Sequence, residues 1–103
     1  MALRWLAGAL VDLRGIREYI AKENPLAAQR VITAIRQEVD ELRTHPAIGR
    51  LGRLENTREL VINRYPYIVA YRESCADIHI LAVVHTSRRW PDSLNDPAGE
   101  AKK

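Results

Sequence analysis

Residues 67–85, YIVAYRESCADIHILAVVH, contain two runs of β-branched and aromatic residues separated by four small or polar ones. Val, Ile and Tyr are typical of strands. The segment ESCA (73–76) between the runs is short enough for a hairpin. The stretch therefore predicts two adjacent antiparallel strands, 67–72 and 77–85. The second run is apolar on both faces, which favours a place inside the sheet.

The flanking sequence adds strands on both sides of this hairpin. The segment RELVI (58–62) predicts a further strand, and its short connection to the hairpin favours an antiparallel meander. Leu3 and Trp5 indicate a short opening strand. The segment HPAIGRLGRLENT (45–57), with its proline and two glycines, is expected to be a loop. We expect a small antiparallel sheet of three to four strands.

The first half of the chain changes to a helical period. Leu6, Leu10, Leu13, Ile16 and Ile20 follow one another at spacings of three or four. Asn24 and Pro25 are typical of a helix N-cap and first helical position. A second apolar stripe follows: Ala28, Val31, Ile35, Val39 and Leu42.

On the polar side of this second helix, Arg36 and Asp40 are spaced for an ion pair. The fold class predicted is α+β, with an N-terminal helical hairpin packed on one face of the sheet and the other face uncovered. We expect one domain over 1–91 and a flexible tail over 92–103, which lacks periodicity.

Charge is distributed unevenly along the 103 residues. Residues 45–91 carry seven arginines and four acidic residues, and the chain as a whole carries a net charge of +3. Such a basic half indicates either an anionic partner, nucleic acid or an acidic protein segment, or a solvated basic surface. The single cysteine, Cys75, excludes an internal disulfide and favours a reducing compartment. The apolar run WLAGALV (5–11) is too short for a membrane span, so we expect a cytoplasmic protein without membrane contact.

Several segments together carry a family resemblance. They are LRGIREYI (13–20), NP (24–25), AAQRV (27–31), GR (49–50), TRELVI (57–62), PYIVAYR (66–72) and HTSRRWP (85–91). In order and spacing they resemble the ParE branch of the ParE/RelE toxin superfamily, the plasmid stabilisation toxins. The resemblance spans the chain except for its tail, and it implies a RelE/ParE-like fold.

The resemblance implies a toxin of a type II toxin–antitoxin pair. Such a toxin is held inactive by a cognate antitoxin, ParD-like or related, whose flexible C-terminal segment wraps around it. Membership of the ParE branch would imply inhibition of DNA gyrase by binding. Membership of the RelE branch would imply a ribosome-dependent endoribonuclease that cleaves messenger RNA. Because the two branches share the fold, the choice between them has to come from site residues.

The residues favour binding over cleavage. A set of basic and aromatic side chains is expected to contact the target, because Arg and Trp often dominate interface energy: Arg58, Arg64, Arg72, His85, Arg88, Arg89 and Trp90. The sequence does not decide whether the protein contacts nucleic acid directly, and it does not identify the residues that bind the antitoxin. The antitoxin segment is expected to be net acidic with spaced apolar residues, adding a strand to an edge or a helix to a groove.

The alternative is a metal-independent endoribonuclease with His85 as general base and Arg88 and Arg89 at the phosphate. Against it, the resemblance places Ile68 where ribonuclease relatives tend to have an arginine. It places Trp90 where they often have a proton-transferring side chain. No residue is therefore assigned as catalytic, and His85 alone keeps this alternative open.

The sequence predicts no metal and no cofactor. His79 and His85 share strand parity but would lie about 20 Å apart, and no clustered His/Cys motif or phosphate loop is present. Glu59, the single carboxylate of the strand at 58–62, is expected to pair with a neighbouring arginine.

Overall fold

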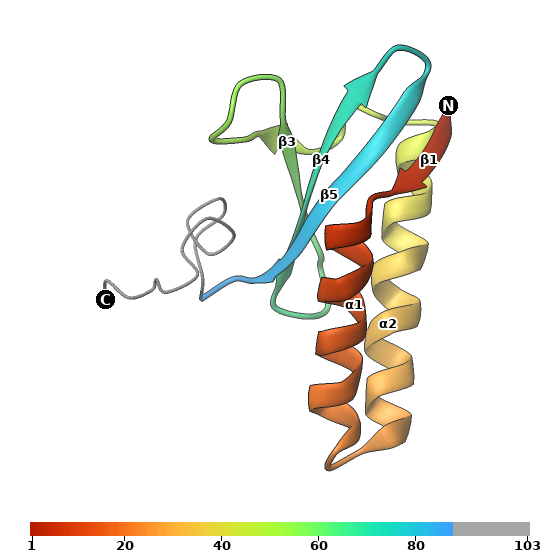
Figure 1. Cartoon of the computed structure of the whole chain (residues 1–103), viewed down its shortest axis with the longest axis vertical. Helices are drawn as coiled ribbons and strands as arrows, with labels where there is room; N and C mark the ends of the chain where they lie inside the picture. Colours follow the sequence, from red (N-terminus) through yellow and green to blue (C-terminus); the bar gives the residue numbers. More distant parts are fainter. Residues whose placement is uncertain (88–103) are drawn as a thin grey trace.

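The two strands predicted from residues 67–85 pair as expected in the computed structural model, which describes residues 1–87 (Figure 1). β4 (Tyr67–Ser74) and β5 (Asp77–His85) are antiparallel and are joined by a turn at Cys75 and Ala76. Cys75 occupies the left-handed region with φ of 57°. The position of β5 inside the sheet is also confirmed.

The sheet is larger than predicted and is mixed. Its strand order is β1-β5-β4-β3-β2. β3 (Arg58–Val61) pairs antiparallel with β4, and β2 (Arg50–Leu51) pairs antiparallel with β3. β1 (Ala2–Trp5) lies parallel to β5. The expectation of three to four antiparallel strands was wrong on both points, because a two-residue strand carries no periodic signal and the long connection from β1 to β5 permits either direction.

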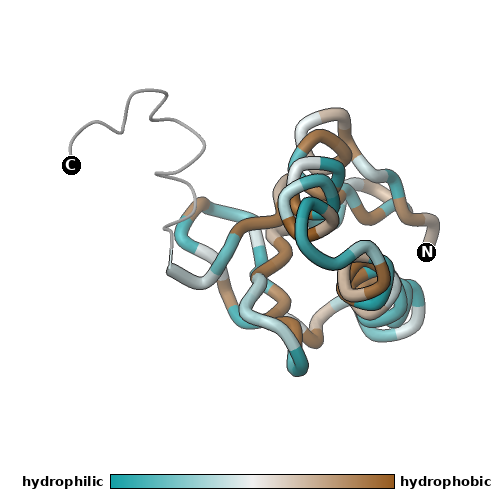
Figure 2. Tube along the Cα trace, turned by 90° about the horizontal axis from the view of Figure 1, so that it is seen from below, coloured by the Kyte–Doolittle hydropathy of each residue, from teal (hydrophilic) through white to brown (hydrophobic). Residues whose placement is uncertain are grey.

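The predicted helical hairpin is confirmed. α1 (Ala7–Ala21) is followed by α2 (Pro25–Asp40) and by a single 3₁₀ turn, η1 (Glu41–Arg43). Asn24 caps α2 as expected, since its Oδ1 accepts a hydrogen bond from the Ala27 N–H at 3.0 Å. Both helices lie on the same side of the strands (Figures 1 and 2).

The main core lies between the helices and the sheet. It combines the predicted stripes of both helices with alternate residues of the strands, among them Leu13, Ile35, Val39, Leu60, Val69, Tyr71, Ile78 and Ile80. Leu10 departs from the predicted stripe, because it is 43 % exposed. On the opposite face of the sheet, a second, smaller cluster contains Ala70, Ala82 and Val84. No helix of residues 1–87 covers that face.

A β-bulge changes which face of β5 each residue occupies. Ala70 is opposite Ala82, but the next residue of β4, Tyr71, is opposite Ile80, so Leu81 is the extra residue. His79 therefore lies on the helix-free face opposite Arg72, whereas His85 is paired with Tyr67 of the core cluster. The expected shared parity of the two histidines was wrong, because a one-residue insertion reverses the alternation.

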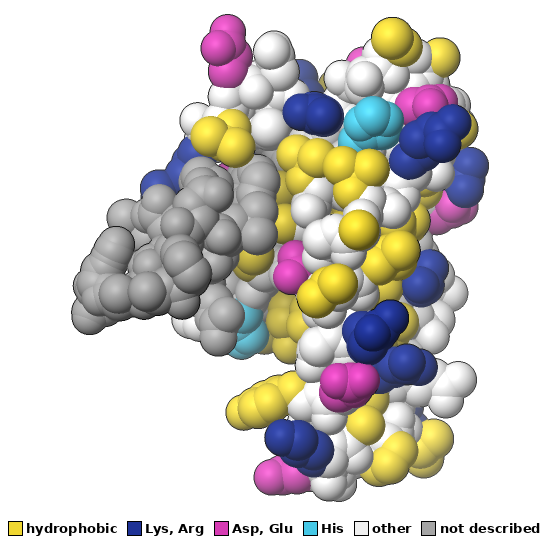
Figure 3. All heavy atoms as spheres, in the orientation of Figure 1, with side chains coloured by type: hydrophobic (Ala, Val, Ile, Leu, Met, Phe, Trp, Pro, Cys, Tyr) yellow, Lys and Arg dark blue, Asp and Glu magenta, His cyan; other side chains and the backbone are white. Residues whose placement is uncertain are grey.

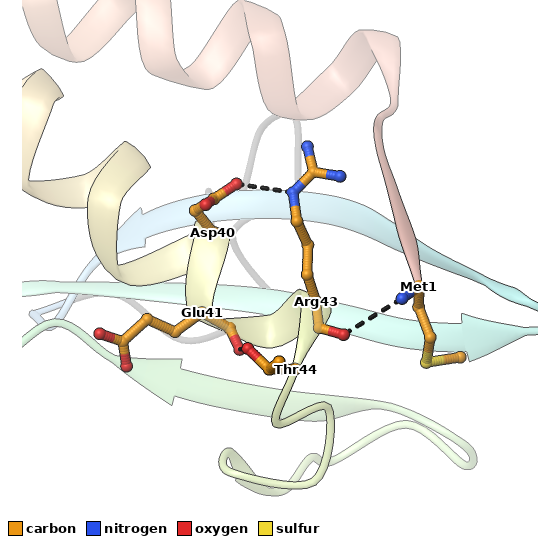
Figure 4. A network of polar contacts seen from close by, with 5 residues as sticks. All are labelled: Met1, Asp40, Glu41, Arg43 and Thr44. Carbon is orange, nitrogen blue, oxygen red and sulfur yellow. Dashed lines mark hydrogen bonds and ion pairs between the residues drawn. The ribbon is translucent and has the colours of Figure 1, made fainter.

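Polar contacts connect the start of β1 to the end of α2 (Figure 4). The Met1 ammonium donates to the Arg43 carbonyl at 3.1 Å, and Arg43 Nε donates to Asp40 Oδ1 at 2.7 Å. Asp40 thus pairs with Arg43 and not, as expected, with Arg36. The Arg36 guanidinium instead lies over the Trp5 ring, 5.4 Å from its centroid.

The end of the domain at residue 91 and the tail over 92–103 lie outside the described residues. Within residues 1–87, neither helix is long and apolar enough to cross a membrane.

Candidate functional site

A groove of about 620 Å³ lies between α1 and the end of β5. α1 lines it with Val11, Gly15 and Tyr19, and the strands line it with Tyr67 and His85. Val11 is 62 % exposed and Tyr19 is 74 % exposed. Large apolar side chains that remain in solvent beside a concave surface are typical of a contact site for another molecule.

His85 is held at the mouth of this groove by two contacts. Its ring packs edge-on against Tyr67, with centroids 5.4 Å apart and an interplanar angle of 85°. The Ser87 N–H donates to Nδ1 at 3.1 Å, and the Ser87 hydroxyl lies 2.9 Å from the same nitrogen. A backbone N–H can only donate, so Nδ1 is an acceptor and the neutral ring carries its hydrogen on Nε2. His85 is therefore arranged to donate a hydrogen bond through Nε2.

Asp12 forms the wall of the groove along the strand edge. β1 pairs with β5 only as far as Ile80. Beyond it, Asp12 Oδ2 accepts a hydrogen bond from the Val83 N–H at 3.0 Å. Burial raises the pKa of Asp12, and the Val83 hydrogen bond opposes this rise. The Asp12 carboxylate thus accepts the Val83 N–H, which would otherwise be free to pair with another strand.

Arg58, one of the predicted target-binding residues, contacts the protein's own backbone. Its Nη1 donates to the Gly49 carbonyl at 2.8 Å and lies 3.5 Å from the Ala47 carbonyl. The guanidinium therefore holds the loop that precedes β2. The pairing predicted for Glu59 is also found in this region, where its Oε1 accepts hydrogen bonds from Arg50 Nε and Nη2 at 3.2 and 3.1 Å.

Arg64 and Arg72 are exposed at different places. Arg64 lies in the turn between β3 and β4 and lines a surface hollow together with α2. Arg72 projects from the helix-free face of β4. Tyr67, the strand partner of His85, lies five residues from Arg72 along β4, which is about 16 Å. His85 and Arg72 therefore lie near opposite ends of the β4–β5 pair. Within residues 1–87 the predicted target-binding residues form no single cluster, and Arg88, Arg89 and Trp90 lie outside the described residues.

The groove was not predicted from the sequence. Its signal was present in Val11 and Tyr19, which are apolar residues that fall outside the predicted stripe of the first helix. Such residues indicate a second, solvent-facing contact surface only when a neighbouring element is known to flank them. That neighbour, the end of β5, is more than 60 residues away along the chain.

Comparison with known proteins identifies the family. Residues 3–90 match the model of the ParE toxin of the type II toxin–antitoxin system parDE. Y4kP of Sinorhizobium fredii is 47 % identical over 92 residues, which are 89 % of this chain and 95 % of that protein. Toxin RelE2 of Caulobacter vibrioides is 38 % identical over 84 residues, covering 82 % and 93 % of the two chains.

Solved structures agree with this assignment. A chain of the chromosomal ParDE toxin–antitoxin system from P. aeruginosa superposes with a TM-score of 0.75 at 26 % identity, covering 82 % of this chain and 95 % of that one. The isolated E. coli RelE toxin shares the fold, with a TM-score of 0.59 at 14 % identity over 97 % and 93 % of the chains. The predicted α+β fold and the family resemblance are thus confirmed: the chain belongs to the ParE toxin family of type II toxin–antitoxin systems.

Proposed function

We propose that this ParE-family toxin inhibits DNA gyrase by binding it and is neutralised by a cognate antitoxin. The geometry of His85 is the main support for binding over cleavage. A general base needs a free lone pair directed at the substrate proton. The only lone pair on the neutral His85 ring is at Nδ1, which already accepts the Ser87 N–H. This arrangement supports a contact role for His85 and gives little support to a catalytic one.

The spread of the predicted contact residues also supports binding. Cleavage of a phosphodiester requires a base and cationic groups around one reacting phosphorus atom. Arg58 and Arg72 lie at the end of the sheet opposite His85, and Arg58 is engaged with the loop backbone. A large protein partner does not require such convergence, because an interface spreads its contacts over a wide surface. The gyrase target itself rests on membership of the ParE family.

The second candidate is a RelE-like endoribonuclease that acts on messenger RNA. Its support is the 38 % identity to Toxin RelE2 and the exposed imidazole of His85. It would require the Ser87 contact to open so that Nδ1 can accept a proton, with Arg88 and Arg89 at the phosphate.

Substitution of His85 separates the two candidates. His85→Gln keeps a hydrogen-bond donor but cannot accept a proton near neutral pH. Under the binding proposal, this variant retains most of the growth inhibition seen on induction without antitoxin. The ribonuclease candidate predicts loss of inhibition, on the order of the 10²–10⁴-fold that general base catalysis contributes.

We further propose that the antitoxin docks in the groove between α1 and β5. The groove offers exposed apolar surface at Val11 and Tyr19, and the chain has a net charge of +3, which favours an acidic partner segment.

Val11→Asp is expected to abolish capture of the antitoxin, because it places a charge in the apolar contact. Leu26→Asp is the matched control, since Leu26 is 65 % exposed on α2, away from the groove. Equal binding by both variants would contradict this placement. Affinity that does not fall with added salt would contradict the acidic segment.

A further inference from the structure

We propose that the helix-free face of the sheet carries a phosphate-binding site formed by Arg4, His79 and Arg72, here called the Arg–His–Arg row. The row lies at the end of the sheet next to the β4–β5 turn, whereas the groove lined by His85 lies at the other end. It is therefore separate from the surface proposed for the antitoxin.

Strand register places the three side chains next to one another. Arg4 of β1 is directly opposite His79 of β5, and His79 is directly opposite Arg72 of β4. Their chain neighbours Leu3, Trp5, Ile78, Ile80 and Tyr71 all pack into the core on the helix side. Because side chains alternate along a strand, the three residues project from the opposite face. Adjacent strands are about 4.8 Å apart, so both arginines reach an anion held over the imidazole.

His79 has unused hydrogen-bonding capacity at this position. Its Nδ1 is buried and has no partner within residues 1–87. A buried nitrogen without a partner is unfavourable, and an oxyanion that reaches it would satisfy it when the nitrogen carries hydrogen. A neutral imidazole carries its hydrogen on either of its two nitrogens, so a tautomer with the hydrogen on Nδ1 can donate to such a ligand.

The charges around the row favour an anion. Asp77 is the acidic partner in this region, and its Oδ2 accepts from Arg4 Nε at 2.7 Å, which leaves the terminal nitrogens of Arg4 for a ligand. Arg72 is exposed and forms no ion pair within the part of the chain that the structure describes. Glu73 follows Arg72 but influences Tyr71 on the helix side. Two arginines thus face one carboxylate.

Phosphate fits this arrangement better than a planar carboxylate. Two guanidinium forks approach from opposite sides and an imidazole from below, and a tetrahedral oxyanion offers oxygens in all three directions. Figure 3 shows a histidine between basic side chains near this end of the sheet, with an acidic side chain close by. The phosphate group belongs either to a free phosphate or nucleotide or to the backbone of a nucleic acid.

The test is titration of the purified full-length toxin with inorganic phosphate and, separately, with a short single-stranded oligonucleotide. It is followed through the imidazole resonances of the three histidines. His79 is expected to shift, with His45 and His85 as internal references. Arg72→Ala is expected to weaken phosphate binding about tenfold, the size of a lost charge-assisted hydrogen bond. Arg14→Ala, an exposed arginine on α1, is expected to leave it unchanged.

Each outcome decides the proposal. A much tighter oligonucleotide complex that also requires Arg72 assigns the site to a nucleic acid backbone, and equal affinity for both ligands assigns it to free phosphate or a nucleotide. A His79 resonance that stays in place at saturating ligand would overturn the proposal. So would equal weakening by Arg14→Ala, which would mean that only net charge attracts the anion.

Discussion

A single phenol group connects the sheet to the loop that precedes β2. Tyr71 is fully buried, and its oxygen accepts a hydrogen bond from the Gly49 N–H at 2.9 Å and donates one to the Pro46 carbonyl at 2.7 Å. Burial raises the pKa of Tyr71, so the phenol stays protonated at neutral pH and the donation persists. A Cβ at Gly49 would lie 2.7 Å from the phenol oxygen, so glycine permits this close approach.

Tyr71→Phe is expected to destabilise the protein by about 1–3 kcal/mol, because it leaves a buried N–H and a partly buried carbonyl without partners. Denaturant unfolding would measure this change. Tyr19→Phe is the matched control, since Tyr19 is 74 % exposed and should change stability little. Similar losses in the two variants would show that the buried hydrogen bonds do not stabilise the loop.

Asp12 predicts a pH dependence of stability. Because its pKa is raised in the folded state, its stabilising contribution is complete below the unfolded pKa of 3.8 and is lost as pH rises through the folded value. Asp12→Asn keeps an acceptor for the Val83 N–H without a buried charge. Relative to wild type, it should gain stability between acidic and neutral pH. Unfolding curves that show wild type gaining on Asp12→Asn over that range would contradict the assignment.

At the scale of elements, sequence patterns predicted the features that depend on residues close together in the chain. The N-cap at Asn24, the two apolar stripes and the 67–85 hairpin each depend on residues a few positions apart, and each was predicted correctly apart from the exposed Leu10. The bulge at Leu81 and the pairing of β1 with β5 depend on contacts between distant segments. Sequence periodicity contains no information about either one, which explains the misplaced histidine face and the unexpected parallel direction of β1.

The start of α2 offers a direct test at this scale. Asn24→Ala removes the acceptor for the Ala27 N–H and is expected to cost about 1 kcal/mol. Asn24→Ser supplies another capping oxygen and should restore most of the loss. If serine is no better than alanine in thermal unfolding, the side-chain cap does not stabilise the start of α2.

At the scale of the molecule, those predicted contact residues that lie within residues 1–87 divide between two ends of one sheet. Composition correctly indicated a basic second half, but it does not say where those charges lie once the chain folds. The structure engages Arg58 with a loop, leaves Arg72 on the helix-free face and seats His85 beside an apolar groove. The proposed binding of a large partner fits this spread of contacts better than chemistry at one phosphorus atom does.

Inhibition of gyrase by binding is tested by adding the purified toxin to DNA gyrase and relaxed plasmid and measuring supercoiling. In parallel, the toxin is incubated with translating ribosomes and messenger RNA. A gyrase-binding toxin is expected to cause a dose-dependent loss of supercoiling that added antitoxin reverses, and to leave the messenger RNA intact. Unaffected supercoiling together with cleaved messenger RNA would contradict it and would establish the ribonuclease alternative.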